Sequence, residues 1–226
     1  MPPEHSPPPR SWLHLAVAGL MFLLPLLPLL LFVSLARDVV MFGALGYDRS
    51  IMVWLHGHES PGMTTTMTAA TELGGLVAVP IIAVLGAGLL WWRGRRRDAA
   101  LLAATVIGAT LINTVLKAVF QRERPDFWEH LVVENSYSFP SGHAMASMSL
   151  AAALVVIARP SRWRWPAVVL GAVYVLVVGP SRVYLGVHFP SDILAGWCVA
   201  LLWATLVVMV LDGASRRRAR RMGITA

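Results

Sequence analysis

Three short polar segments hold the side chains of this sequence that are best suited to chemistry. In chain order they are Lys117-x6-Arg124-Pro125, Pro140-Ser141-Gly142-His143 and Ser181-Arg182-x5-His188-x3-Asp192. Together they supply three cations, two imidazoles and one carboxylate, and the first contains the only lysine among 19 basic residues. This combination of side chains is suited to binding a phosphate group and attacking its phosphorus atom.

Catalysis of phosphoryl transfer depends mostly on positioning and on stabilising charge on the non-bridging oxygens. Lys117, Arg124 and Arg182 could supply the positive charge that a metal ion supplies in many phosphoryl-transfer enzymes. The Ser141 hydroxyl and the Gly142 N–H could donate further hydrogen bonds from the start of a helix, where anions bind favourably. Four nearby carboxylates lack the spacing of a metal motif and are interpreted as a solvated loop: Glu123, Asp126, Glu129 and Glu134. We therefore expect neither a metal ion nor a cofactor.

Two histidines in these segments provide a nucleophile and a proton donor. His188 is the better nucleophile, because Asp192 follows four residues later and can bind one ring nitrogen, which raises the basicity of the other. Attack by His188 would form a covalent phosphohistidine. His143 would protonate the leaving oxygen and afterwards activate water. His130, which belongs to no motif, is an alternative acid.

The segments between these motifs are strongly apolar. The chain has 57% apolar and 14% charged residues and a mean hydropathy of +0.64, which is unlike a soluble domain. Six apolar stretches are close to the length of a membrane-spanning helix: Ser11–Ala36, Gly75–Trp92, Ala99–Phe120, His143–Ala158, Trp165–Pro180 and Phe189–Leu211. They predict an all-α polytopic membrane protein with one six-helix domain at 11–211, a disordered tail at 1–10 and a basic tail at 212–226.

The basic residues are distributed unevenly over the loops. With six spans, 13 of the 19 fall on one side of the membrane: Arg10, Arg93, Arg95, Arg96, Arg97, Arg159, Arg162, Arg164, Arg216, Arg217, Arg218, Arg220 and Arg221. By the positive-inside rule this side is cytoplasmic, so both termini are expected there and the three polar segments on the extracytoplasmic side. The Arg-rich tail is interpreted as a topology determinant or a contact to anionic lipids, and nucleic acid is not an expected partner.

Local spacing leads to three further expectations. If the third span stays helical to its end, Lys117 and Arg124 lie on one helix face, two turns apart. The loop after the first span is expected to contain a short interfacial helix around Trp54 and a turn-rich piece from Pro61. Cys198, the only cysteine, is interpreted as a buried structural residue.

The three motifs resemble those of the type 2 phosphatidic acid phosphatases, also called lipid phosphate phosphatases. The family pattern is Lys-x6-Arg-Pro, Pro-Ser-Gly-His and Ser-Arg-x5-His-x3-Asp, and this chain matches it without a departure. The resemblance implies a metal-independent phosphatase. It assigns phosphate binding to Lys117, Arg124, Ser141, Gly142 and Arg182, acid catalysis to His143, nucleophilic attack to His188, and support of His188 to Asp192.

Residues at helix ends suit a phosphate at headgroup depth whose apolar tail lies between helices, so a membrane lipid is the expected substrate. The short chain favours undecaprenyl diphosphate, with phosphatidylglycerophosphate and phosphatidic acid as alternatives. A bacterial inner membrane, with the site facing the periplasm, is the location that the resemblance and chain length imply.

Three other classes of function are compatible with parts of this pattern. The motifs also resemble those of vanadium-dependent haloperoxidases. These enzymes are soluble, and the six apolar spans argue against a soluble protein. A non-enzymatic channel or transporter would need polar residues at mid-membrane depth, and the spans have few. A lipid phosphotransferase, which passes the phosphoryl group to an alcohol, has the same motifs and stays an alternative.

Overall fold

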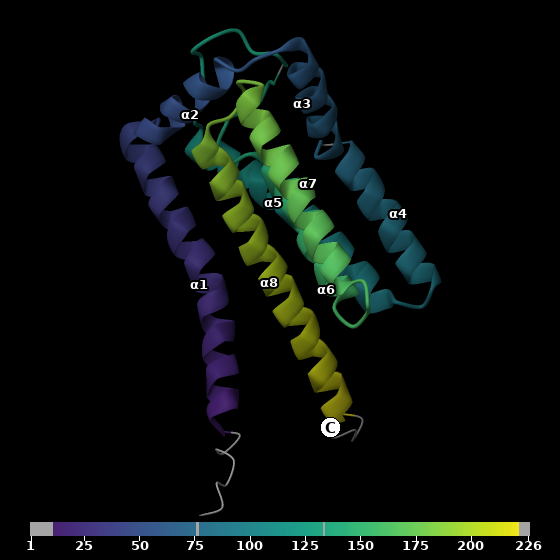
Figure 1. Cartoon of the computed structure of the whole chain (residues 1–226). Helices are drawn as coiled ribbons and strands as arrows, with labels where there is room; N and C mark the ends of the chain where they lie inside the picture. Colours follow the sequence, from purple (N-terminus) through teal and green to yellow (C-terminus); the bar gives the residue numbers. More distant parts are fainter. Residues whose placement is uncertain (1–10, 76, 133, 222–226) are drawn as a thin grey trace, which may run out of the picture.

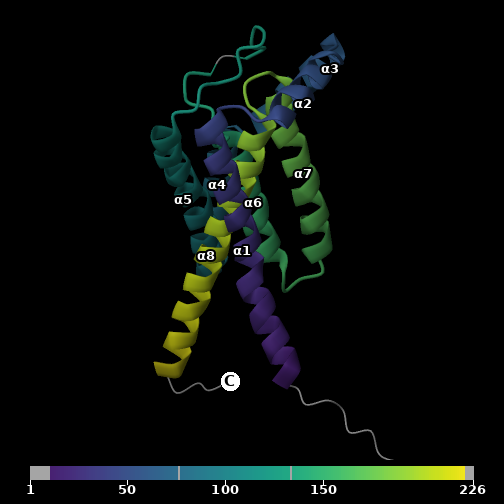
Figure 2. The same cartoon turned by 90° about the vertical axis from the view of Figure 1, so that its left-hand side faces the viewer.

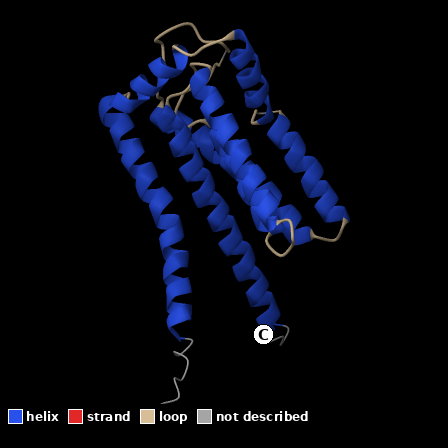
Figure 3. Cartoon of the chain, in the orientation of Figure 1, coloured by secondary structure: helices blue, strands red, loops and turns tan. Residues whose placement is uncertain are grey.

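The computed structural model describes residues 11–75, 77–132 and 134–221, with side chains between residues 25 and 215. The tail predicted to be disordered, 1–10, and the end of the basic tail, 222–226, lie outside the described residues. Within them the chain forms helices joined by loops, without strands (Figure 3). The helices are α1 Ser11–Phe42, α2 Gly46–His56, α3 Pro61–Leu73, α4 Ala78–Trp92, α5 Arg96–Phe120, α6 Gly142–Ala158, α7 Arg164–Tyr184 and α8 Pro190–Arg221. The prediction of an all-α chain is confirmed.

The six predicted spans correspond to α1, α4, α5, α6, α7 and α8. Among the described residues, five apolar stretches are long enough to cross a membrane: Pro25–Phe42, Pro61–Trp92, Arg96–Phe120, Arg164–Tyr184 and Pro190–Ser215. The helix α6 is apolar but shorter, with 17 residues. It packs against α5, α7 and α8, so these helices cover much of its length. Large apolar side chains face outwards on the other helices, among them Leu27, Val84, Leu111 and Leu170.

The loop between the first two predicted spans differs in part from expectation. The helix α2 is the short helix predicted around Trp54, but the segment from Pro61 is a regular helix, α3, and not a turn-rich piece. The Ser60 side chain caps this helix by accepting a hydrogen bond from the Met63 N–H at 3.3 Å. Proline is tolerated at the first helical position, where its missing N–H has no helical partner to lose.

The helix ends divide the molecule into two opposite faces. At one end lie the α4–α5 and α6–α7 loops, the first turn of α1 and the last turn of α8 (Figure 1). At the other end lie α2, α3, the long α5–α6 loop and the short α7–α8 loop (Figures 1 and 2). The arginines at 93–97 and 159–164 belong to the first end. The three polar segments all lie at the second end.

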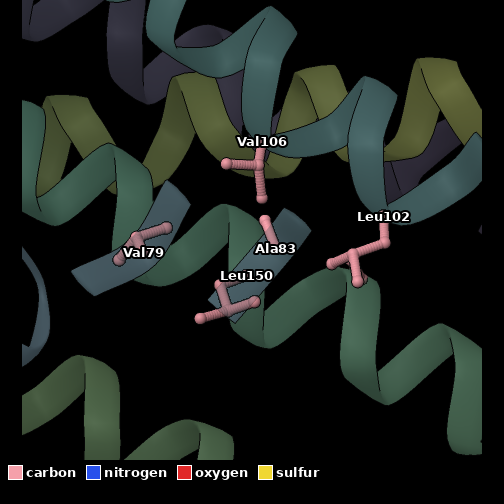
Figure 4. Packing of buried hydrophobic residues seen from close by; sticks show 6 residues of the cluster. Val79, Ala83, Leu102, Val106 and Leu150 are labelled. Atoms are coloured by element: carbon pink, nitrogen blue, oxygen red, sulfur yellow. The ribbon is translucent and has the colours of Figure 1, made fainter. Parts of the chain in front are cut away.

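Two packing features hold the helices in register below the polar segments. A buried apolar cluster joins α4, α5 and α6 (Figure 4) and consists of Val79, Ala83, Leu102, Val106, Leu150 and Ala153. Between α5 and α8, the Trp203 ring lies against Gly108, where an added Cβ would come within 2.2 Å of the indole. The Trp203 indole N–H donates to the Ala104 carbonyl at 3.0 Å. In a bilayer such close contacts drive helix association, because lipid tails are as apolar as the side chains.

Candidate active site

The first polar segment begins on α5 and ends in the loop beyond it. The helix stops at Phe120 because Gln121 adopts a left-handed backbone conformation with φ 46°. The expectation that Lys117 and Arg124 share one helix face is therefore wrong. The two side chains nevertheless converge on Ser136 of the α5–α6 loop. Lys117 Nζ donates to its Oγ at 2.8 Å, and Arg124 Nε donates to its carbonyl at 2.8 Å.

The second polar segment forms the start of α6. Ser141 is fully buried, and its Oγ caps the helix by accepting from the Ala144 N–H at 3.4 Å. Gly142 is the first helical residue, and a Cβ there would lie 3.1 Å from Asn113 Oδ1 on α5. His143 follows on the cavity side, and we find no hydrogen bond from its ring to another described residue. Its ring nitrogens are thus available to a bound molecule.

The third polar segment places a histidine next to a buried carboxylate. The helix α8 begins at Pro190, so His188 lies in the loop just before it and Asp192 in its first turn. The distance from His188 Nδ1 to Asp192 Oδ2 is 3.2 Å. The same oxygen accepts from the Phe189 N–H at 2.9 Å and from the Ser138 hydroxyl. The carboxylate therefore orients the ring and favours the tautomer with the proton on Nδ1.

The other ring nitrogen of His188 faces the cationic side of the site. Arg124 Nη1 lies 3.2 Å from His188 Nε2 and donates to the Val187 carbonyl at 2.7 Å. Burial, together with the nearby charges of Arg124, Arg182 and Lys117, holds the pKa of His188 well below its ordinary value of 6.5. The imidazole is therefore neutral at physiological pH. Its Nε2 lone pair faces the part of the cavity that Arg124 and Lys117 make favourable for an anion.

Arg182 does not line the cavity itself, but it pairs with Glu134, which does. Its guanidinium is 2% exposed, donates to Thr71 Oγ1 at 2.9 Å and pairs with Glu134. Glu134 also lies 3.5 Å from Arg124 Nη2. Partial burial acts to raise the pKa of Glu134, but Arg182 and Arg124 outweigh it and lower the pKa. The interpretation of Glu134 as part of a solvated loop is therefore wrong, because its carboxylate pairs with two arginines. The local sequence does not show this pairing, since Arg182 lies 48 positions away.

Two charged residues that the motif patterns do not specify belong to the same site. Arg122 is buried between Asp192 and Asp48 of α2, and its Nη2 lies 3.0 Å from Asp48 Oδ2. Its Nη1 also donates to Ser191 Oγ at 2.8 Å. In the sequence, Arg122 was one of six basic residues on the side opposite the arginine-rich loops, which could have drawn attention to it. Nothing in the local pattern around Asp48 marks it, since its partners lie 74 and 143 positions away.

A cavity of about 830 Å³ opens over these side chains. Five of the eight predicted site residues line it: Lys117, Arg124, Gly142, His143 and His188. Ser141, Arg182 and Asp192 lie behind its wall. Thr110, Asn113 and Thr114 extend the lining along α5 below Lys117, at the spacing of one helix face. Among the described residues, no group of three or more histidine, cysteine, aspartate or glutamate side chains is arranged to hold a metal ion. Cys198 is buried within α8, as predicted.

Fold and site together define an integral-membrane phosphatase, and comparison with known proteins agrees. Residues 98–216 match the model of the PAP2 superfamily. The chain is 38% identical over 158 residues to phosphatidylglycerophosphatase B of Bacillus subtilis, covering 66% of this chain and 75% of that protein. It is 29% identical over 191 residues to undecaprenyl-diphosphatase of Sulfolobus acidocaldarius, covering 80% and 88%.

A solved structure shares the same arrangement of helices. The crystal structure of the first transmembrane PAP2-type phosphatidylglycerolphosphate phosphatase from Bacillus subtilis superposes with a TM-score of 0.76 and 32% sequence identity, covering 84% of this chain and 96% of that one. This chain belongs to the PAP2 superfamily. It is a multi-pass membrane phosphatase that acts on lipid phosphates.

Proposed function

We propose that this protein removes a phosphate from a membrane lipid through a phosphohistidine formed on His188. The observation that carries the proposal is the pairing of His188 Nδ1 with Asp192 at 3.2 Å, while Nε2 faces Arg124 in the cavity. In the first step Nε2 attacks phosphorus, and the bond from phosphorus to the lipid oxygen breaks as His143 gives that oxygen a proton. In the second step His143 takes a proton from water, which attacks phosphorus and releases inorganic phosphate and His188.

The cationic side chains have distinct parts in this proposal. Lys117 and Arg124 line the cavity and bind the non-bridging oxygens, whose charge they neutralise. The Gly142 N–H at the start of α6 adds a donor, because the first N–H groups of a helix have no helical acceptor. Ser141 contributes by capping α6. Arg182 acts from behind the wall, where an incoming phosphate replaces Glu134 as its anionic partner.

The proposed location is a bacterial inner membrane with the site on the periplasmic side. Its support is the separation of the two ends. The α4–α5 and α6–α7 loops, which contain the arginines at 93–97 and 159–164, lie at one end (Figure 1), and the polar segments that line the cavity belong to the other. By the positive-inside rule the arginine-rich end and both termini face the cytoplasm. Reporter fusions at the C-terminus test this orientation. A periplasmic reporter active after residue 226 would contradict it.

Two lipid substrates have specific support. Undecaprenyl diphosphate is supported by the name of one relative. Phosphatidylglycerophosphate is supported by the name of another relative and by the lining of the cavity below Lys117. Asn113 Nδ2 is bound to the Pro140 carbonyl at 3.0 Å, which leaves Oδ1 as an acceptor. The glycerol between the two phosphates of phosphatidylglycerophosphate has a hydroxyl that could donate to it, whereas the isoprenoid diphosphate has none.

Phosphate release from detergent-solubilised protein tests this function. Undecaprenyl diphosphate, phosphatidylglycerophosphate and phosphatidic acid are compared in the presence of EDTA, with His188→Ala as the inactive control. We expect release that EDTA does not reduce and that His188→Ala abolishes. Complete loss in EDTA would contradict the metal-free mechanism. Unchanged release by His188→Ala would exclude His188 as the nucleophile. Labelled substrate quenched in alkaline detergent, where the acid-labile P–N bond survives, should leave phosphate bound to wild-type protein.

The acceptor of the phosphoryl group is tested in the same assay. Added glycerol or another alcohol competes with water for the phosphohistidine. We propose hydrolysis, so the yield of inorganic phosphate should equal the substrate consumed. A phosphorylated alcohol as the main product would instead identify a lipid phosphotransferase. A chain without any turnover, but with ion or lipid flux in vesicles, would be a channel or transporter.

A further inference from the structure

A buried row of charges continues from the proposed nucleophile to a helix outside the motifs. It runs from His188 through Asp192 and Arg122 to Asp48 on α2. We propose that Arg122 and Asp48 are positioning residues, which fix the Asp192 carboxylate and match its charge to the positive charge that develops on His188. The inference rests on the proposed phosphohistidine mechanism. It concerns residues that no motif specifies: Arg122 occupies an unspecified position of the first motif, and Asp48 lies outside all three.

The carboxylate of Asp192 is held from two sides by different donors. Its Oδ1 accepts from Arg122 Nη1. Its Oδ2 accepts from the Phe189 N–H and the Ser138 hydroxyl and faces His188 Nδ1. A carboxylate with donors on both oxygens has one orientation only. Without Arg122, Oδ1 would be a buried anionic oxygen with no partner among these residues, and the group could turn away from the imidazole.

Asp48 holds the other end of the guanidinium. Its Oδ1 accepts from the Ser191 N–H at 2.9 Å, and its Oδ2 accepts from Ser191 Oγ at 2.6 Å and lies 3.0 Å from Arg122 Nη2. The Phe189 ring lies 4.0 Å from the guanidinium carbon and covers one of its faces. Arg122 is thus fixed between α2 and α8, and it cannot approach His188 or move away from it.

The charges in this row do not cancel. Two carboxylates and one guanidinium leave one negative charge beside a neutral imidazole. When Nε2 attacks phosphorus, the ring keeps its Nδ1 proton and gains a positive charge, which this excess charge stabilises. Arg122 keeps the excess at one. Without Arg122, the buried carboxylates of Asp192 and Asp48 would have no cation between them and would bind a proton. A protonated Asp192 is a weaker partner for the imidazole ring.

Direct phosphate binding by Arg122 does not fit its surroundings. Its side chain is 4% exposed, and both terminal nitrogens are bound to carboxylates. Arg122 borders the cavity, but its terminal nitrogens are already paired, so Lys117 and Arg124 are the cations that bind the phosphate. Loss of Arg122 should therefore slow the chemical step and leave substrate binding almost unchanged.

Kinetics of Arg122→Gln and Asp48→Asn test the inference, with Asp212→Asn as a matched control. Asp212 pairs with Arg97 between α5 and α8 at the opposite end of the molecule. We expect kcat to fall about 10- to 100-fold in the two site variants, as for other groups that orient a catalytic histidine. The KM and the inhibition constant of vanadate should stay within about 3-fold, since neither residue touches the phosphate. The control should keep wild-type kcat.

The pH profile separates positioning from a structural role. Arg122→Gln removes a positive charge near the His188–Asp192 pair and should move the acid-side midpoint of kcat/KM up by about one pH unit. Asp48→Asn removes a negative charge and should move it down. The other charged or titratable groups around the pair stay the same in both variants: Tyr47, Lys117, Arg124, Glu134, His143 and Arg182. Arg122→Lys, which keeps the charge but binds one carboxylate at a time, should restore the midpoint and only part of kcat.

Several results would overturn the inference. Midpoints that do not move, or that move in the same direction in both variants, would assign the row to stability alone. A rise in KM and in the vanadate constant with kcat unchanged would make Arg122 a phosphate ligand. Failure of both variants to give folded protein, judged by gel filtration, would also assign the row to folding. A wild type without activity on any lipid would contradict the proposed function instead, so the two failures are distinguishable.

Discussion

Asn113 is the residue at which the choice between lipid substrates can be tested most directly. Its amide nitrogen is bound to the chain at Pro140, so its oxygen faces the cavity beside Gly142 in a fixed orientation. A fixed acceptor costs little conformational entropy when it binds a ligand hydroxyl. It can accept a hydrogen bond from a headgroup with a hydroxyl near the phosphate, whereas an isoprenoid diphosphate has no such hydroxyl.

Asn113→Leu should therefore lower kcat/KM for phosphatidylglycerophosphate about 2- to 12-fold relative to undecaprenyl diphosphate, the value of one neutral hydrogen bond. The measurement is the ratio of kcat/KM for the two lipids, in which any general loss of activity cancels. Thr114→Val, which removes a neighbouring hydroxyl on the same face of α5, serves as the comparison. An unchanged ratio for Asn113→Leu would remove this argument for phosphatidylglycerophosphate.

The motif residues could be located from the sequence because their spacing is local. His188 and Asp192 are four positions apart, and their contact follows from the start of a helix between them. The roles of Glu134 and Arg122 do not follow from the sequence, because their partners Arg182 and Asp48 lie on helices far along the chain. The local sequence around a charged loop residue is the same whether its side chain is solvated or forms an ion pair with a buried arginine.

At the scale of helices, the contact between α5 and α8 limits what the chain tolerates. Gly108→Ala should destabilise the protein by about 1–3 kcal/mol, because the added methyl overlaps the Trp203 indole. Gly88→Ala on α4 is the matched control, since no atom lies within 4 Å of its added Cβ. It should be neutral or stabilising by about 0.5–1 kcal/mol. Thermal unfolding in one detergent compares the two, and equal midpoints would contradict the packing argument.

Helix positions were predictable to the extent that length and hydropathy determine them. The sequence predicts the six spans because each is an apolar run of near-membrane length. It does not predict α3, because the threonines and methionines of this helix form no strongly periodic pattern. The end of α5 depends on a single backbone conformation at Gln121, which is not a glycine and gave no signal. That one residue decides that Arg124 lies in a loop and meets Val187 and His188.

For the whole molecule, the buried histidine links stability to pH. Native His188 stays neutral, because burial and neighbouring cations lower its pKa, whereas in the unfolded chain it takes up a proton below about pH 6.5. The unfolded state therefore binds the extra proton, and the free energy of unfolding falls as pH drops below 6.5. The fall from this group is about 1.4 kcal/mol per pH unit.

The difference between wild type and His188→Asn isolates this contribution. Unfolding of unliganded protein is followed between pH 7.5 and pH 5, where we expect the wild type to lose stability more steeply below pH 6.5. Above pH 7 the two curves should run parallel. Parallel curves over the whole range would mean that native His188 binds its proton as readily as the unfolded chain does.

The single lysine has a practical consequence for labelling. Lys117 Nζ lies at the cavity, bound to Ser136 Oγ, and every other basic side chain of the protein is an arginine. An amine-reactive reagent can thus acylate only the chain's α-amino group and the active site. Coupling through amines will therefore attach the protein either at its α-amino group or at the cavity. The part of the labelling by an acyl fluorophore that vanadate prevents will report occupancy of the site without any engineered residue.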